Sequence, residues 1–216
     1  GAVRSWSEAR RISNRHFLDE FILYSFIPQD HSSSVWMLNG NVSKGLDFLR
    51  GMLSLRGSYM GYDGSLFQNG IETPYSSDTW TVTPKVNSTF SGWLNASYEL
   101  NFTKNRLDVK ESGITSSSES IWQTLSVNLM PDRKYYIKLI GEHYHNRMAS
   151  GVSKSLFLCD AEFTYNFSSG WELNLSLRNI FNQDTYSYTL YDGLTSINKE
   201  YRIRPRNVLA SVFFRF

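Results

Sequence analysis

The chain of 216 residues has little of several features that mark familiar classes of protein. It has one cysteine, Cys159, which excludes an internal disulfide, and its place in an alternating pattern predicts a small apolar filler rather than a reactive thiol. The formal net charge is only +2, so the composition gives no reason to expect a nucleic acid partner. No apolar run approaches ~18 residues, so no transmembrane helix is predicted.

Aromatic residues are abundant, at 15% of the chain, and the five prolines are few. The clearest strand signal is the end of the sequence, where even positions are apolar and odd positions are mixed. Strict alternation of β-branched and aromatic residues predicts a strand. Outer-membrane barrels commonly end on an aromatic residue of such a strand, so we interpret it as a closing strand that faces lipid. Its apolar positions, the expected terminal barrel signal, are Val208, Ala210, Val212, Phe214 and Phe216.

The same alternation recurs along the chain and predicts about ten strands, or eleven. Residues 1–15 are expected to hold one strand, and residues 16–27 another. Tight turns alternate with longer polar loops, which is the arrangement of a bacterial barrel with short turns on one edge. The expected turns lie at Gly45, Gly92, Pro131-Asp132 and Gly170, and the expected loops at 28–34, 59–81, 104–118, 146–154 and 182–200. Within 59–81, Asn69-Gly70 is a candidate turn of a small hairpin.

Alternation alone does not separate a membrane barrel from a soluble sandwich, whose strands also have one apolar face. Three features favour the barrel: strands of roughly ten residues or more, aromatic residues beside the short turns, and the aromatic end of the chain. We therefore predict an all-β, antiparallel, up-and-down transmembrane β-barrel. Residues 1–216 are expected to form a single segment of its wall.

Few residues suggest catalysis. On a strand, His143 and His145 would share a face, and two histidines at this spacing are able to bind a metal, but no third ligand follows. With Glu142 they are expected at a polar rim, and Asp184 and Asp192 in the last long loop. No phosphate loop or nucleophile elbow is present. We therefore predict no enzymatic activity, no catalytic or metal-binding residues and no cofactor.

Charged residues also recur on the face opposite the apolar one. Asp160 and Glu162 share a face of one predicted strand. We expect a solvated, lumenal face there, on which Lys138 or Arg178 of the flanking strands pairs with the two carboxylates. The same lumenal position is expected for the alternating arginines before the closing strand, with a plug or substrate contact as a further hypothesis: Arg202, Arg204 and Arg206.

Three short runs resemble a known family. The run Leu177-Arg178-Asn179-Ile180-Phe181-Asn182, followed by Tyr186 and Tyr188, resembles the N-x-F-N…Y segment near the end of TonB-dependent outer-membrane receptors. Arg204-Pro205-Arg206-Asn207 and Gly141-Glu142-His143-Tyr144 are similar to the Bacteroidetes-type branch. The likeness covers about residues 130–216 and is general before them. The motif residues that carry it are Asn179, Phe181, Asn182, Arg204, Pro205, Arg206 and Asn207.

The resemblance implies a barrel of about 22 strands around an N-terminal plug domain, opened by the TonB complex. Because 216 residues cannot supply so many strands, we expect the C-terminal part of a longer receptor chain. The implied function is uptake of a nutrient, of unknown kind, across the bacterial outer membrane. The implied partners are outer-membrane lipid, the barrel-assembly machinery, the plug domain of the full-length chain and the TonB complex.

Two other interpretations stay open. The chain is also compatible with a complete small outer-membrane barrel of ten strands, either a hydrolase or an adhesin. A hydrolase would need acidic residues and histidines that converge at the outer rim. The second alternative is a soluble all-β binding domain, which would stay folded without detergent.

Overall fold

Fourteen β-strands and one short 3-10 turn make up the secondary structure of the computed structural model, which describes residues 1–17, 22–110, 113–148, 151–167, 170–192 and 195–214. The elements in chain order are β1 (Ala2–Ala9), β2 (Ile12–Phe17), β3 (Ile22–Ile27), β4 (His31–Leu46), η1 (Asp47–Leu49), β5 (Gly51–Gln68), β6 (Ile71–Ser91), β7 (Leu94–Val109), β8 (Ile114–Leu129), β9 (Tyr135–Arg147), β10 (Ser153–Asn166), β11 (Trp171–Arg178), β12 (Thr185–Asp192), β13 (Thr195–Arg202) and β14 (Asn207–Phe214).

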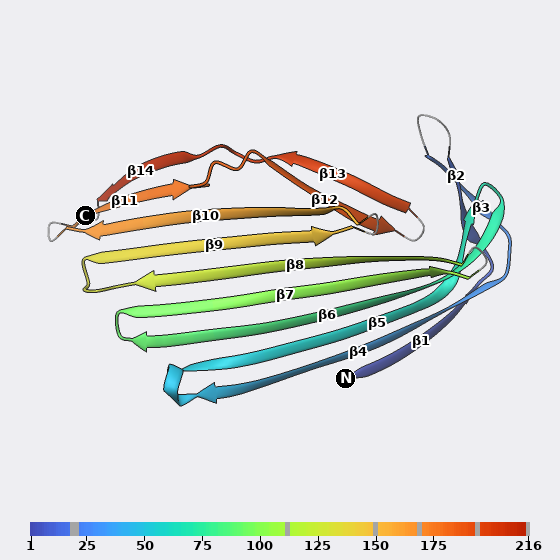
Figure 1. Ribbon diagram of the computed structural model, residues 1–216, viewed down its shortest axis with the longest axis horizontal. Helices are drawn as coiled ribbons and strands as arrows, with labels where there is room; N and C mark the ends of the chain where they lie inside the picture. The colour runs from blue at the N-terminus through green and yellow to red at the C-terminus, as the bar shows by residue number, and fades with distance from the viewer. Residues whose placement is uncertain (18–21, 111–112, 149–150, 168–169, 193–194, 215–216) are drawn as a thin grey trace.

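Twelve strands belong to one large sheet, along whose main path neighbouring strands are antiparallel. Ten strands follow one another in the order β1-β4-β5-β6-β7-β8-β9-β10-β11-β14 (Figure 1). The β2–β3 hairpin joins this sheet of twelve strands through a short parallel pairing of Asn14 and Arg15 with the end of β5. Strands β12 and β13 form a separate two-stranded sheet. The expected all-β, antiparallel fold is confirmed.

The two faces of the sheet differ in chemistry. One row of cross-strand partners from β7 to β14 is Ala96, Val127, Leu139, Ala161, Leu177 and Val208. Side chains one position along point to the opposite side of a strand, so the next row lies on the other face. Its members are Asn95, Asn128, Lys138, Glu162, Ser176 and Leu209. We call the two sides of the sheet the apolar face and the polar face.

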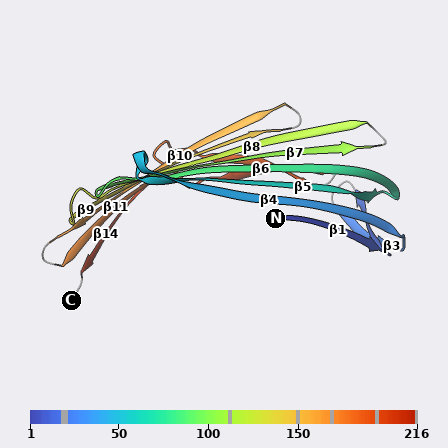
Figure 2. The same ribbon diagram turned by 90° about the horizontal axis from the view of Figure 1, so that it is seen from below.

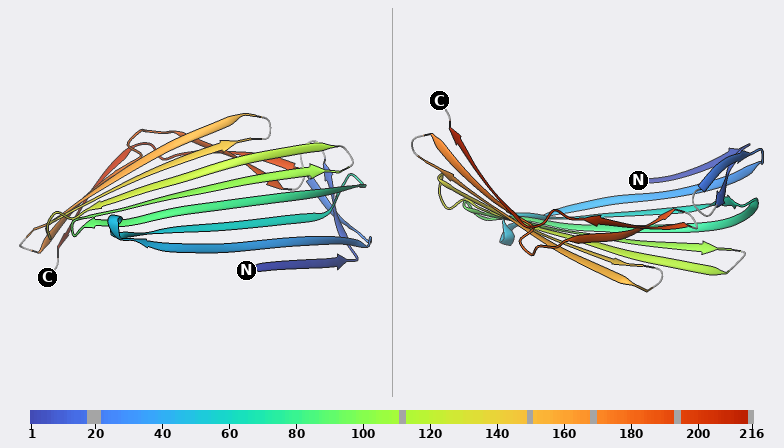
Figure 3. Two further views of the ribbon diagram at one scale, coloured as in Figure 1. Left: turned by 60° about the horizontal axis from the view of Figure 1, so that its bottom comes forward. Right: turned by 90° about the horizontal axis from the view of Figure 1, so that it is seen from above.

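Little of this apolar surface is buried. Among the described residues, the buried apolar side chains are Ile12, Phe67, Val109 and Leu156, which lie on four different strands. By contrast, Leu125 and Val212 on the apolar face are 48% and 61% exposed. The views in Figures 2 and 3 show that the large sheet is one layer that twists strongly along its strands. The hydrophobic core of a two-layer domain is therefore not formed by the described part of the chain.

Several expected loops are strands instead. The expected loop over 59–81 is wrong, because β5 and β6 run through it. The candidate hairpin turn at Asn69-Gly70 within it is confirmed: Gln68 pairs with Ile71, and both turn residues have positive φ. The loop over 104–118 is also mostly strand, and the one over 182–200 contains β12 and β13. These segments lack an apolar face, so the alternation signal disappears although the hydrogen-bond ladder continues. The count of ten or eleven strands was therefore too low.

The chain reversals at the opposite end of the strands lie where the sequence predicted tight turns. Strands end at Ser91, Leu129 and Asn166, and the next strands begin within a few residues, as expected at the tight turns. At the turn expected at Gly45, β4 continues to Leu46 and η1 makes the reversal, with Arg50 in the left-handed region at φ 45°. Near the N-terminus, β2 begins at Ile12, so the expected division into strands over 1–15 and 16–27 is wrong.

Candidate functional site

The histidines that could have formed a metal or catalytic site lie on β9. His143 and His145 point to the apolar face, with ring centroids 6.4 Å apart, whereas Glu142 points to the polar face. His145 Nδ1 is hydrogen-bonded to Ser155 Oγ at 2.7 Å. Within the described ranges, no group of three metal-ligating side chains is found.

The two aspartates of the expected last loop are at opposite ends of β12. Asp184 precedes β12, and its main-chain oxygen accepts a hydrogen bond from Ile203 N at 2.9 Å. Asp192 ends the same strand. Over the residues whose side chains the structure describes, no hydrogen bond or ion pair joins Asp184 to His143 or His145.

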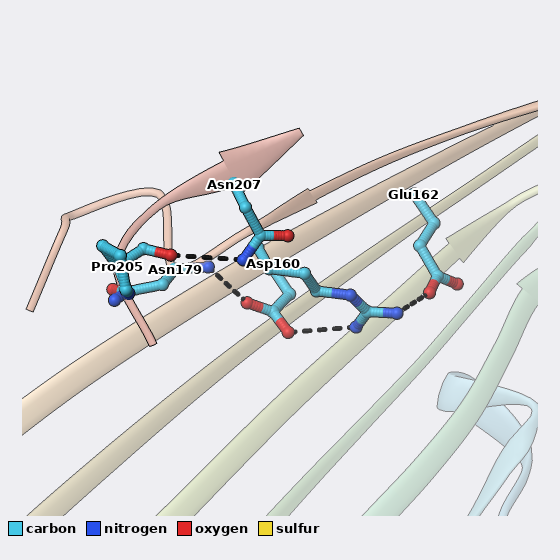
Figure 4. Close-up of polar contacts among 6 residues, drawn as sticks. Asp160, Glu162, Asn179, Pro205 and Asn207 are labelled. Carbon is cyan, nitrogen blue, oxygen red and sulfur yellow. Dashed lines mark hydrogen bonds and ion pairs between the residues drawn. The ribbon is translucent and has the colours of Figure 1, made fainter. Parts of the chain in front are cut away.

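A charged cluster on the polar face has the composition expected from the sequence. Arg178 at the end of β11 donates from Nη1 to Asp160 Oδ2 at 3.0 Å and from Nη2 to Glu162 (Figure 4). Lys138 is opposite Glu162 in the β9–β10 register, but Arg178 makes the contacts. The expectation that a flanking basic residue pairs with Asp160 and Glu162 is confirmed for Arg178. One guanidinium thus bridges two carboxylates of β10.

Asn179, the next residue, ties together segments far apart in the sequence. Its side-chain Nδ2 donates to the main-chain oxygens of Gln183 at 2.7 Å and Arg204 at 2.9 Å. Its Oδ1 accepts from Gln183 N at 2.9 Å, and its own N–H donates to Asp160 Oδ1 at 2.8 Å. The residue is 6% exposed and has φ 52°. Asparagine tolerates this left-handed backbone better than most residues.

A second asparagine in the same turn makes a further link. Arg206 N donates to Asn182 Oδ1 at 2.9 Å. Asn207 Nδ2 donates to the main-chain oxygen of Pro205 at 3.2 Å, as Figure 4 shows. Phe181, between the asparagines, packs its ring 5.2 Å from that of Phe157. The structure therefore brings all the motif residues to one junction, formed by residues 179–183 and 203–207. Here the chain leaves the large sheet after β11 and returns to it at β14.

The arginines near this junction do not share a strand face. Arg202 ends β13, and residues 203–206 are outside any strand, so the expected alternation of Arg202, Arg204 and Arg206 on one strand face is wrong. Pro205 has no N–H and cannot donate to a strand ladder, which favours a break here. Arg204 takes part in the junction through its main-chain oxygen.

The hairpin of β12 and β13 lies against the polar face of the sheet. The Tyr186 ring is 5.5 Å from Tyr144 of β9, which itself stacks on Trp122 of β8 at 5.6 Å. The Tyr186 ring is also 5.5 Å from the Tyr188 ring, and the Tyr188 ring is 5.8 Å from that of Tyr201. Five aromatic rings thus connect the sheet to the hairpin. Sequence reasoning missed this arrangement, although Asp192-Gly193 is a known hairpin signal.

A groove of about 620 Å³ opens on the polar face beside the hairpin. Its walls come from β4 to β9 and from β12, and they include Tyr62, Tyr75, Tyr186 and Tyr188. This volume is within the range of small-molecule sites in proteins. The groove is a second site that the sequence did not indicate, because its residues come from seven different strands and the loop after β9.

The closing strand has the expected form over the residues that are described. Val208, Ala210, Val212 and Phe214 pair with alternate residues of β11 on the apolar face, and Phe214 packs 4.6 Å from Trp171. Phe216, the last member of the expected barrel signal, lies outside the described residues. Among the described strands, β14 and β1 each pair with a neighbour on one side only, so their outer edges are the two free edges of the ten-stranded path.

Comparisons with protein families, with curated proteins and with solved structures find no match to this chain. Over the described ranges, no helix has the length and apolar character to cross a membrane.

Proposed function

We propose that this chain is part of the wall of an outer-membrane β-barrel, with its apolar face toward lipid and its polar face toward the lumen. The observation that carries this proposal is the uncovered apolar face. Burial of apolar surface contributes roughly 25 cal/mol per Å², so a soluble protein would cover a face of this extent with a second layer. Lipid hydrocarbon covers it in a membrane.

Strand length supports the same proposal. A strand needs about 9–11 residues to cross the bilayer, and the central strands β4 to β10 have 13 to 21 residues. Strands of this length would cross and continue beyond the lipid. The parts of β5 and β6 that lack an apolar face fit such an extension, because both faces would then meet water.

The free edges indicate what would complete such a barrel. In the ten-stranded path every strand is antiparallel to its neighbours, so β1 and β14 run in opposite directions. A barrel in lipid has no open edge. Whatever closes it must therefore contribute an even number of strands, or the edges must pair directly. We favour additional strands of a longer chain, as the resemblance to TonB-dependent receptors implies.

In this proposal the protein is a receptor and transporter for nutrient uptake and not an enzyme. The polar face, with its ion pairs and the inward hairpin, would line the passage. A plug domain and the TonB complex would gate it, and the barrel-assembly machinery would insert it. The substrate would meet residues of the polar face.

Labelling of single cysteines tests the membrane part of the proposal. In the full-length protein, with Cys159→Ser as background, Leu139→Cys and Lys138→Cys place an environment-sensitive fluorophore on the apolar and polar face of β9. In phosphatidylcholine vesicles, doxyl-labelled lipid should quench the label at 139 and leave the label at 138 bright. Equal quenching at both positions, or none at 139, would contradict the proposal and favour a protein layer over the apolar face.

Cross-linking of the free edges separates a wall segment from a complete ten-stranded barrel. Ser5→Cys on β1 and Ser211→Cys on β14 place thiols on the two end strands, both on the polar face. A disulfide within one chain would mean that ten strands close on themselves. We expect no such bond in the native protein, whereas Asn128→Cys with Lys138→Cys, on paired strands, should cross-link.

A further inference from the structure

The side chains that the polar face presents to the groove carry no formal charge. Three charged residues also belong to the lining, Arg106, Glu119 and Arg147, but in the strand register their side chains lie on the opposite, apolar face. There Arg106 forms an ion pair with Asp108 at 2.8 Å, and Glu119 forms one with Lys104 at 2.9 Å. An ionised ligand in the groove would lose its hydration without meeting an opposite charge. The groove therefore suits an uncharged molecule.

One end of the groove is apolar and aromatic. Met37 of β4 is the cross-strand partner of Met60 of β5, and the two side chains are 42% and 41% exposed. Beside them, the rings of Tyr62 and Tyr75 are 5.4 Å apart. Thioethers and tyrosine rings make favourable contacts with a flat aromatic ring. The hydroxyls of a saturated sugar ring would be left without partners against the methionines.

The floor beyond this end is neutral and polar. It consists of hydroxyl and amide groups from β6, β7 and β8, including Ser77, Ser116 and Ser118. Thr79 Oγ1 donates to Asn105 Oδ1 at 2.8 Å, which shows that these groups are within hydrogen-bonding distance across strands. Tyr186 and Tyr188 of the hairpin border this floor. Such a surface offers hydrogen bonds to a flexible chain that bears hydroxyls.

We propose that the groove is a binding site for an uncharged molecule in which a flat aromatic ring is joined to a hydroxyl-bearing chain. The ring would lie at Met37, Met60, Tyr62 and Tyr75, and the chain would run over the floor toward the hairpin. This inference goes beyond the proposed transport function and does not need a membrane, because the groove and its lining are properties of the sheet and hairpin alone.

Binding of three probes to the full-length protein tests this ligand class. Riboflavin is uncharged and has a flat ring with a hydroxylated chain, flavin mononucleotide adds only a phosphate, and sucrose is neutral without an aromatic ring. We expect saturable binding of riboflavin, read as quenching of its fluorescence, at least tenfold tighter than that of flavin mononucleotide. Sucrose at a large excess should not displace it. Tighter binding of the phosphate form, displacement by sucrose, or no binding of riboflavin up to about 1 mM would overturn the proposal.

Two matched substitutions locate the site. Tyr62→Leu removes a ring from the apolar end and should weaken riboflavin binding about 3- to 10-fold. Tyr98→Leu makes the same change on the apolar face of β7 and should leave affinity unchanged. Because either variant could misfold, circular dichroism and the unfolding midpoint are compared first, and Met60→Gln provides a second change at the site. Equal effects of Tyr62→Leu and Tyr98→Leu would place the ligand elsewhere. The quenching by doxyl lipid of a label at position 139 is measured on the same protein. This second measurement distinguishes a failure of the ligand proposal from a failure of the membrane proposal.

Discussion

Asn179 and Arg204 are 25 positions apart in the chain, yet the side-chain amide of Asn179 donates to the main-chain oxygen of Arg204 at 2.9 Å. This bond joins the start and the end of the excursion that contains the β12–β13 hairpin. The same side chain also holds Gln183 through two hydrogen bonds. A hairpin of two strands is at best marginally stable alone, so its position on the polar face depends on this junction and on the aromatic contacts.

We predict that Asn179→Ala loosens the hairpin. It removes three side-chain hydrogen bonds, each of which contributes about 0.5–1.5 kcal/mol, and places alanine at φ 52°. The expected loss in the free energy of unfolding is about 2–4 kcal/mol, measured by urea denaturation, with faster proteolysis within residues 183–203. Asn179→Gly accepts the positive φ, so it should recover part of the loss, about 1 kcal/mol. An unchanged proteolysis rate in Asn179→Ala would contradict this role.

The alternation of apolar and polar residues was enough to predict the strands that have an apolar face. The pattern of β7, β10, β11 and β14 follows directly from it, and so do the turns after Ser91 and Leu129. It failed for the outer parts of β5 and β6, where Tyr59 faces Trp80 at 4.3 Å within polar sequence. Backbone pairing determines such segments, and backbone pairing depends on a neighbouring strand that local sequence does not reveal.

The candidate site was predictable only in part. The pairing of Arg178 with Asp160 follows from neighbouring strands with known faces. The junction did not follow, because Asn179 acts through main-chain atoms of Gln183 and Arg204 and its sequence signal was only the family resemblance. The groove depends on the register of seven strands and on the hairpin position. A one-residue shift in register would change its entire lining.

The bridge at Arg178 gives a second prediction. Its side chain is 40% exposed, and those of Asp160 and Glu162 are 30% and 24% exposed, so solvent weakens the pairing. Arg178→Ala should therefore lower the free energy of unfolding by only about 1 kcal/mol. In an Asp160→Asn, Glu162→Gln background the same change should cost close to nothing, since the two like charges are gone. An equal cost in both backgrounds, in a double-mutant cycle of urea midpoints, would show that the arginine acts through packing alone.

The hairpin should respond to alkaline pH. The hydrogen bond between the hydroxyls of Tyr188 and Tyr201, 3.4 Å apart, raises the pKa of Tyr188 above its ordinary value. A raised pKa means that the folded hairpin favours the neutral phenol. This contribution is present below the ordinary tyrosine pKa of about 10 and is lost as pH rises through the raised value.

Tyr201→Phe should therefore lower the pKa of Tyr188. This pKa is measured by NMR of ¹³C-labelled tyrosine, and the signal of Tyr188 is assigned from its loss in Tyr188→Phe. Tyr135→Phe, at the start of β9 and away from the hairpin, is the control and should leave this pKa unchanged. If Tyr188 titrates identically with and without the Tyr201 hydroxyl, the two side chains do not share a hydrogen bond in solution.

The last prediction compares the two faces of β8. Leu125 and Ser126 are adjacent, but Leu125 lies opposite Gly141 on the apolar face and Ser126 lies opposite Ile140 on the polar face. If lipid covers the apolar face, Leu125→Arg brings a charge into hydrocarbon and should cost about 2–4 kcal/mol of folding free energy near the bilayer centre. Ser126→Arg points into the lumen and should cost less than about 1 kcal/mol. Urea-dependent folding of the full-length protein into phosphatidylcholine vesicles measures both. If the charge at Ser126 costs as much as the charge at Leu125, hydrocarbon does not distinguish the two faces.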